Sequence, residues 1–205
     1  MEKEKYSEQI LLQVAEEVFL EKGYRNAKML AIAERANVSH TMLHYYFRNK
    51  ENLFQTIFMK KIQMVSLSFE EIFDRHLPFF ETVRLIIESQ FDFVAKNPKL
   101  PFFILNEILS NKDNRALVFE ALSPKVKDIS VFFKTMLSDE IEKGTIRPVS
   151  MSDFLMSIVS INLTTFILLP VMDVLSLANG NSDVDKILRD RRESNVQFIL
   201  NALRP

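Results

Sequence analysis

The stretch AKMLAIAERANVSHTMLHYYFRNKENL, residues 27–53, decides the fold of the N-terminal part of this 205-residue chain. Leu30, Ala33 and Ala36 recur at helical spacing and predict the buried stripe of a short helix. Asn37 then interrupts the pattern, and asparagine tolerates the positive φ that a tight turn between packed helices often needs. The stretch therefore predicts a helix that ends in a tight turn.

A second short helix is predicted directly after this turn. Ser39 is a good N-cap for it, because its hydroxyl accepts a backbone N–H that has no partner within the helix. The helix, from Ser39 to about Tyr45, buries Leu43 and turns the side chains of His40, Thr41, His44 and Tyr45 outward. Two short helices around a tight turn form a helix-turn-helix, whose second helix enters the major groove of DNA.

The longer segment GYRNAKMLAIAERANVSHTMLHYYFRNKENLF, residues 23–54, resembles the DNA-binding signature of the tetracycline-repressor (TetR) family of bacterial regulators. The Gly-Tyr pair, Ile-Ala, Val-Ser, Tyr-Phe and Lys-Glu all fall in register with that signature. The resemblance implies an all-α protein with two parts. Residues 1–50 would form a three-helix helix-turn-helix DNA-binding domain, and residues 51–205 a larger helical domain for ligand binding and dimerisation.

The composition agrees with a cytoplasmic helical protein. Hydrophobic residues make up 47% of the chain, only three residues are glycine, and an apolar–polar alternation typical of strands is hard to find. The absence of cysteine excludes disulfides and thiolate metal sites. The N-terminus lacks the apolar core of an export signal, so we expect a cytoplasmic location.

A net charge of −1 conceals a cationic segment. Residues 22–61 contain eight Lys or Arg and two Glu, a net charge of +6, so the remaining residues carry −7. A solvated helical face would explain the charge alone equally well. The overlap with the helix-turn-helix favours a polyanionic partner, double-stranded DNA.

The resemblance, together with the outward face of the second short helix, predicts a set of DNA-binding residues. Lys50 opens the next helix, where a lysine opposes the helix dipole unless a phosphate is bound there. Lys28 would contact phosphate by charge where the family tends to have a hydroxyl, and His40, Thr41 and His44 depart from the residues that the family usually carries. The full predicted set is Lys28, Ser39, His40, Thr41, His44, Tyr45 and Lys50.

Two features of the sequence allow an alternative to DNA and ligand binding. His40 and His44 have a spacing that can bind zinc, but no glutamate or cysteine lies close by, so we expect no metal. The uncharged run 154–172 nearly reaches the length of a membrane span. Its polar residues, its proline, the acidic residues at both ends and the lack of flanking Lys or Arg favour the centre of a soluble bundle or an interface, and no membrane partner.

Besides the two helices of the helix-turn-helix, further helices are predicted, with a polar turn at 111–114 and a helix start at Ser123-Pro124. Their expected ranges are 7–22, 50–73, 79–96, 101–110, 115–121, 123–144 and 183–203. The body is rich in phenylalanine, which is typical either of plain core or of a pocket for an apolar or planar small molecule. The residues predicted to bind such a ligand are Phe91, Phe103, Asn106, Phe133, Asn162 and Phe166.

These observations predict a ligand-responsive, sequence-specific transcriptional regulator, most simply a repressor, although the sequence leaves an activator open. It would bind its operator as a homodimer through its last two helices and be released by a small-molecule effector. The sequence shows neither a catalytic set nor a phosphate-binding glycine loop, so we predict no enzyme activity and no cofactor. The alternative is a helical small-molecule-binding protein or enzyme with a vestigial DNA-binding head.

Overall fold

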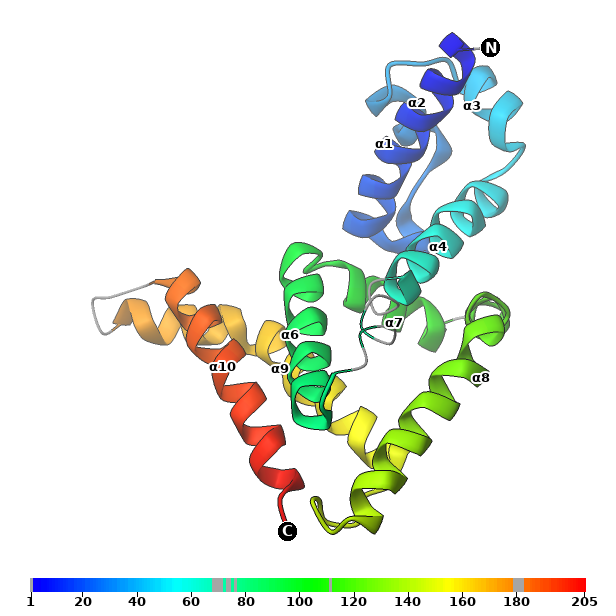
Figure 1. Ribbon diagram of the computed structural model, residues 1–205. Helices are drawn as coiled ribbons and strands as arrows, with labels where there is room; N and C mark the ends of the chain where they lie inside the picture. Colours follow the sequence, from blue (N-terminus) through cyan, green and yellow to red (C-terminus); the bar gives the residue numbers. More distant parts are fainter. Residues whose placement is uncertain (1, 68–71, 73–74, 76, 111, 179–182) are drawn as a thin grey trace. The chain divides into compact units, whose positions relative to one another are not determined.

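The computed structural model describes residues 2–67, 72, 75, 77–110, 112–178 and 183–205, and the elements within them are helices, as predicted (Figure 1). The helices are α1 (Glu2–Asn26), α2 (Met29–Arg35), α3 (His40–Phe47), α4 (Lys50–Leu67), α6 (Phe79–Lys96), α7 (Leu100–Ser110), α8 (Lys112–Glu142), α9 (Met151–Ala178) and α10 (Val184–Leu203).

The helices form two compact units. The first unit comprises Met1–Met64 and Lys99–Leu122, and the second comprises Val65–Pro98 and Ser123–Pro205. Helix α7 thus belongs to the same unit as the helix-turn-helix. The separation into independent domains at residues 1–50 and 51–205 stays a prediction.

In the first unit, α1 packs against α2 and α7, and α2 packs against α3. The buried residues of α1 include Leu11, Ala15, Val18 and Phe19, which recur on one face of the helix, whereas Ile10 is exposed. Arg35 on α2 donates hydrogen bonds to Glu17 and Glu21 on α1, each at 2.8 Å at its shortest. Leu30 is an exception to the predicted stripe, since it is 56% exposed; the short α2 buries only Ile32 and Ala33.

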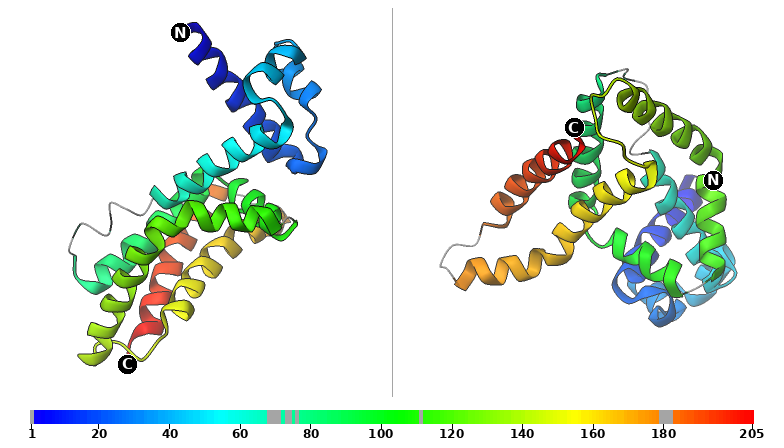
Figure 2. Two further views of the ribbon diagram at one scale, coloured as in Figure 1. Left: turned by 90° about the vertical axis from the view of Figure 1, so that its right-hand side faces the viewer. Right: turned by 90° about the horizontal axis from the view of Figure 1, so that it is seen from below.

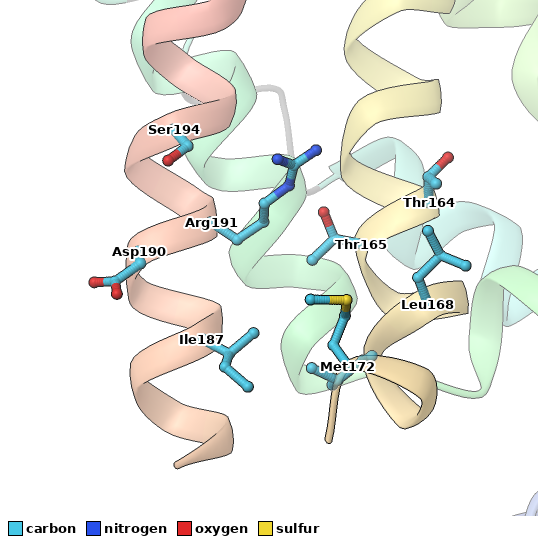
Figure 3. Close-up of a pocket in the computed structure, with 9 residues that line it drawn as sticks. Thr164, Thr165, Leu168, Met172, Ile187, Asp190, Arg191 and Ser194 are labelled. Carbon is cyan, nitrogen blue, oxygen red and sulfur yellow. The ribbon is translucent and has the colours of Figure 1, made fainter. Parts of the chain in front are cut away.

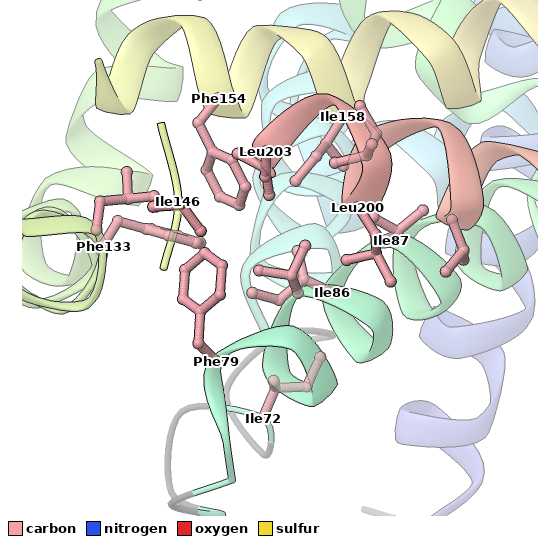
Figure 4. Close-up of a cluster of buried hydrophobic side chains, with 14 residues drawn as sticks. Ile72, Phe79, Ile86, Ile87, Phe133, Ile146, Phe154, Ile158, Leu200 and Leu203 are labelled. Atoms are coloured by element: carbon pink, nitrogen blue, oxygen red, sulfur yellow. The ribbon is translucent and has the colours of Figure 1, made fainter. Parts of the chain in front are cut away.

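In the second unit, α6, α9 and α10 pack against one another (Figure 2). Their apolar faces, together with residues of α8, form one core (Figure 4). An ion pair joins α10 to α6. Two nitrogens of the Arg192 guanidinium, Nε and Nη2, donate to the Asp92 carboxylate at 2.8 and 2.9 Å. Arg192 is therefore half-buried, while the other residues of 189–193 are exposed. The core residues are Ile72, Phe79, Val83, Ile86, Ile87, Phe133, Leu137, Ile146, Phe154, Ile158, Val196, Ile199, Leu200 and Leu203.

Two helix boundaries differ from the prediction. The backbone of α8 is helical from Lys112 to Glu142. The predicted polar turn at 111–114 is therefore wrong from residue 112 onward. The predicted start of a separate helix at residue 123 is also wrong. A proline inside a helix removes one backbone donor and disfavours helix before it. The other hydrogen bonds of this 31-residue helix outweigh that local preference. Beyond Leu67, the predicted end of α4 near residue 73 lies outside the described residues.

Helix α9 is long and apolar enough, over Met151–Leu175, to cross a membrane, a criterion that core helices of soluble proteins also meet. It packs along α6 and α10, and it buries Asn162 at their contact. These contacts support the predicted bundle helix. Much of the remaining apolar surface of α9 is exposed in the single chain.

Candidate nucleic-acid interface

The turn between α2 and α3 is built by local chemistry. Asn37 has φ 54°, the positive value that its side chain tolerates. Ser39 caps α3, because its hydroxyl accepts a hydrogen bond from the backbone N–H of Met42 at 3.1 Å. Leu43 and Phe47 bury the inner face of α3. The predicted helix-turn-helix is therefore present, with one face of α3 held inward by its apolar residues.

The opposite face of α3 is polar and open to solvent. His40 and Thr41 are exposed, and Tyr45 is 80% exposed. His44 is half-buried: its ring lies 4.4 Å from that of His40, and its Nδ1–H donates to the Arg48 carbonyl at 2.6 Å. The side chain of His44 thus bonds to the backbone at the end of α3, while the other three present imidazole, hydroxyl and phenol groups to solvent.

Lys50 lies at the start of α4 beside the end of α1. Asn49 caps this helix, its side-chain oxygen accepting from the N–H of Asn52 at 2.8 Å. The Lys50 ammonium lies 4.5 Å from the centre of the Tyr24 ring and donates to the Arg25 carbonyl at 3.3 Å. Partial burial lowers the pKa of Lys50, and the Glu107 carboxylate opposes that shift. The ammonium has three donors, so its bond to the Arg25 carbonyl leaves two for a phosphate.

Residues 11–57 match the family described as "Bacterial regulatory proteins, tetR family", and this range contains α2, α3 and the capped start of α4. The chain carries a TetR-family DNA-binding domain at residues 11–57. It is accordingly a DNA-binding transcriptional regulator.

Individual relatives agree with this assignment. The HTH-type transcriptional regulator YhgD of Bacillus subtilis (strain 168) is 27% identical over 139 residues, which cover 68% of this chain and 71% of that protein. Among solved structures, FadR from Bacillus subtilis in complex with stearoyl-CoA is 21% identical with a TM-score of 0.64, covering 95% and 98% of the two chains. AibR in complex with isovaleryl coenzyme A and operator DNA is 18% identical with a TM-score of 0.67, covering 91% and 96%.

The second unit of this regulator contains a cavity of about 190 Å³ between α6, α8 and α9. We call it the α6–α8–α9 cavity. Gln90 is its polar lining residue: Oε1 accepts from Asn162 at 3.0 Å, and the amide nitrogen has no hydrogen-bond partner among the described residues. The cavity is lined by Ile86, Gln90, Ile129, Phe133, Leu155, Ile158 and Val159.

The six predicted ligand-binding residues are distributed over both units. Phe133 lines the α6–α8–α9 cavity, and Asn162 is hydrogen-bonded to its lining residue Gln90. Phe91 and Phe166 pack on each other with ring centres 5.0 Å apart in a separate small cluster. In the first unit, Phe103 packs against the rings of two α4 phenylalanines, and Asn106 is exposed. The ligand role of this set stays a prediction.

A second, more open pocket lies between α9 and α10, with a volume of about 460 Å³. We call it the α9–α10 pocket. Arg191 extends from α10 toward α9, where Thr165 and Thr164 lie (Figure 3). Apolar side chains from both helices complete the lining, which consists of Thr164, Thr165, Leu168, Leu169, Met172, Ile187, Asp190, Arg191 and Ser194.

The sequence did not predict the roles of two polar residues, Gln90 at the α6–α8–α9 cavity and Glu107 in the first unit. Gln90 lies within an apolar helix pattern, and its amide gives no sign that it borders a cavity. Glu107 lies in another apolar helix, α7, and its carboxylate accepts a hydrogen bond from the backbone N–H of Tyr24. Tyr24 and Glu107 are 83 positions apart in the sequence. A contact between residues so distant in sequence leaves no local pattern. A charged residue within an apolar helix is the one signal that marks Glu107 for attention.

Proposed function

We propose that this regulator is a cytoplasmic homodimeric repressor that leaves its operator when an acyl-coenzyme A thioester binds to the body. The observation that carries the DNA-binding half of this proposal is the exposed polar face of the capped helix α3. Such a face, on a helix whose other side is locked into a small core, fits the major groove. His40, Thr41 and Tyr45 offer groups for base edges and phosphates, while Lys28 and Lys50 offer charge.

The dimer would form through α9 and α10. Two recognition helices must lie about 34 Å apart to reach successive major grooves on one face of DNA, which a monomer cannot achieve. Helix α9 supports this interface with a set of large apolar side chains that are exposed in the single chain, and it borders the α9–α10 pocket with Leu168 and Met172. A two-fold related copy would cover them. The set is Met156, Val159, Ile167, Leu168, Val171, Met172, Val174, Leu175 and Leu177.

The proposed effector class rests on the similar solved structures, two of which hold acyl-coenzyme A molecules. The α6–α8–α9 cavity supports it, since its walls are apolar except for Gln90. The unpartnered amide N–H groups of Gln90 suit a thioester carbonyl at the mouth of an acyl chain site. A cavity of about 150 Å³ holds a benzene molecule, so the 190 Å³ here favours a short acyl chain over a long one.

The effector would act by linkage. A ligand can weaken DNA binding only if it binds more tightly to a conformation whose recognition helices do not fit the spacing of the grooves. The size of the effect is set by the ratio of the ligand's affinities for the two conformations. The acyl-coenzyme A would therefore bind the free protein more tightly than the DNA complex, by the same factor by which it weakens DNA binding.

An electrophoretic mobility-shift experiment tests the proposal. The probe is the DNA upstream of the chain's own coding sequence at low salt, with the wild-type protein, Tyr45→Ala and the control Phe119→Ala, which removes another exposed ring of the first unit. We expect a shift for the wild type and the control and a weaker one for Tyr45→Ala. Isovaleryl-coenzyme A should release the DNA at lower concentration than stearoyl-coenzyme A. No shift with the wild type would favour a small-molecule-binding protein or enzyme with a vestigial head.

A further inference from the structure

Glu107 is a buried carboxylate that none of the predicted DNA contacts uses. It lies on α7, in the first unit, and is only 4% exposed. Burial of a charged group is costly unless its hydrogen bonds are satisfied, so its partners indicate its role. Its Oε1 accepts from the backbone N–H of Tyr24 at 3.1 Å, and its Oε2 lies 3.4 Å from the side-chain nitrogen of Asn114 on α8.

The N–H that Glu107 accepts belongs to a break in α1. Gly23 adopts φ 70° and ψ 169°, which interrupts the helix, and the backbone resumes a helical turn at Tyr24. The first N–H groups of a helical turn have no partner within it. Glu107 therefore caps this turn as an N-cap residue would, but from another helix. A side-chain carbon added at Gly23 would lie 3.8 Å from Glu107 Oε1, so α7 lies close to this joint.

The same joint carries two cations of the predicted DNA contact set. The ring of Tyr24 lies under the Lys50 ammonium at 4.5 Å, and the carbonyl of Arg25 accepts from it. Lys28 follows the joint directly and precedes α2, and the N–H of Ala27 bonds to the Gly23 carbonyl at 3.2 Å. A shift of the joint would therefore move the cations on both sides of it.

We propose that Glu107 is a positioning residue for DNA recognition: from α7 it caps the turn after Gly23 and so fixes where Lys28 and Lys50 stand. Glu107 itself touches no DNA, because its side chain is buried. Its effect reaches DNA through the backbone N–H of Tyr24.

The sign of the effect separates this role from simple electrostatics. Removal of a negative charge near a cationic DNA-binding surface should strengthen binding to a polyanion. Loss of the cap should weaken binding, because the cations are no longer held in place. Glu107→Gln removes the charge and keeps the acceptor oxygen for Tyr24, whereas Glu107→Ala removes both.

The test uses the full chain and a labelled random-sequence duplex at low salt, so that no operator is required. We expect Glu107→Ala to lose about tenfold in affinity, the factor that corresponds to one lost hydrogen bond to a charged group. Glu107→Gln should stay within about threefold of the wild type or bind more tightly. The matched control Glu8→Gln removes an exposed carboxylate of the same unit and corrects for the change in net charge.

A second measurement keeps the inference testable if Glu107→Ala fails to fold. In the wild-type protein the Tyr24 amide should exchange its hydrogen slowly, and in Glu107→Gln more quickly, since a neutral oxygen accepts less strongly. Fast exchange of the Tyr24 amide in the wild type would overturn the inference. So would a Glu107→Ala protein that binds DNA as tightly as the wild type, or a Glu107→Gln protein that loses as much DNA affinity as Glu107→Ala. If the wild type bound no duplex at all, the DNA-binding function would fail together with the inference.

Discussion

Single residues at the surface of the head carry side chains that the fold does not require. Tyr45 leaves 80% of its side chain in water, and His40 and Thr41 are exposed beside it. Substitutions at such positions usually change the free energy of unfolding by less than about 0.5 kcal/mol. Changes in DNA binding at these positions can therefore be assigned to the interface.

Lys50 gives a prediction at this scale. Lys50→Ala should reduce DNA affinity about equally for all sequences and make the salt dependence shallower, by about one unit in the slope of log K against log salt, because one phosphate contact is lost. Fluorescence anisotropy at several salt concentrations measures both quantities. Lys134→Ala, which removes an exposed lysine of the second unit, serves as the control for net charge. An unchanged affinity and slope would exclude a backbone contact.

The helix ends in the head were predictable from the sequence because each depends on neighbouring residues. The positive φ of Asn37 and the cap Ser39 involve atoms at most three residues away, and both predictions are confirmed. The long-range partners of Gln90 and Glu107 could not be predicted, because they depend on how helices distant in sequence pack.

At the scale of elements, a buried chain of amides joins α6, α9 and α10. Asn162 on α9 donates to the Ile87 carbonyl and to Gln90 Oε1 on α6, and its own oxygen accepts from Asn195 on α10 at 2.9 Å. A buried polar group is tolerated because such bonds replace those lost to water. The oxygen of Asn195 is buried without a partner in the described part of the chain, so this network is already incompletely satisfied.

Asn162→Ala should therefore destabilise the protein by about 2–4 kcal/mol, because it removes the buried side-chain hydrogen bonds that join α9 to α6 and α10 and leaves a cavity in their place. Urea unfolding followed by circular dichroism measures the change. Thr164→Ala, on an exposed position of the same helix, should change the stability by less than about 0.5 kcal/mol. Equal stability of the two variants would show that the amide chain contributes nothing to the packing of α9.

The continuous helix α8 shows the limit of prediction at this scale. Ser123-Pro124 is a strong local signal for a helix start, yet the backbone runs through it within a helix from Lys112 to Glu142. The opposite holds for α6, whose predicted range, residues 79–96, is confirmed. There, the residues before and after it, Pro78 and Asn97-Pro98, stop the helix whatever packs against it.

At the scale of the whole molecule, the proposed dimer predicts how assembly and DNA binding are linked. Val171→Glu places a charge on the exposed apolar face of α9, where Val171 is 54% exposed. It should shift the protein to monomers in sedimentation and lose operator binding by at least about tenfold, while the helical content stays unchanged. Burial of an unpaired carboxylate in an interface costs several kcal/mol.

The control for this variant is Val131→Glu, which adds the same charge to an exposed valine of α8 outside the proposed interface. It should remain dimeric and bind DNA. A dimeric Val171→Glu protein would place the interface elsewhere, and a monomeric one that still binds its operator tightly would separate DNA binding from dimerisation.

The central claim is that two copies of the α3 face read two successive major grooves. Hydroxyl-radical footprinting of the wild-type dimer on the DNA upstream of its own coding sequence tests this claim most directly. We predict two protected segments, centred about one helical turn or a whole multiple of it apart, both of which disappear with Tyr45→Ala. A single protected segment, or two segments that persist unchanged in that variant, would contradict the account.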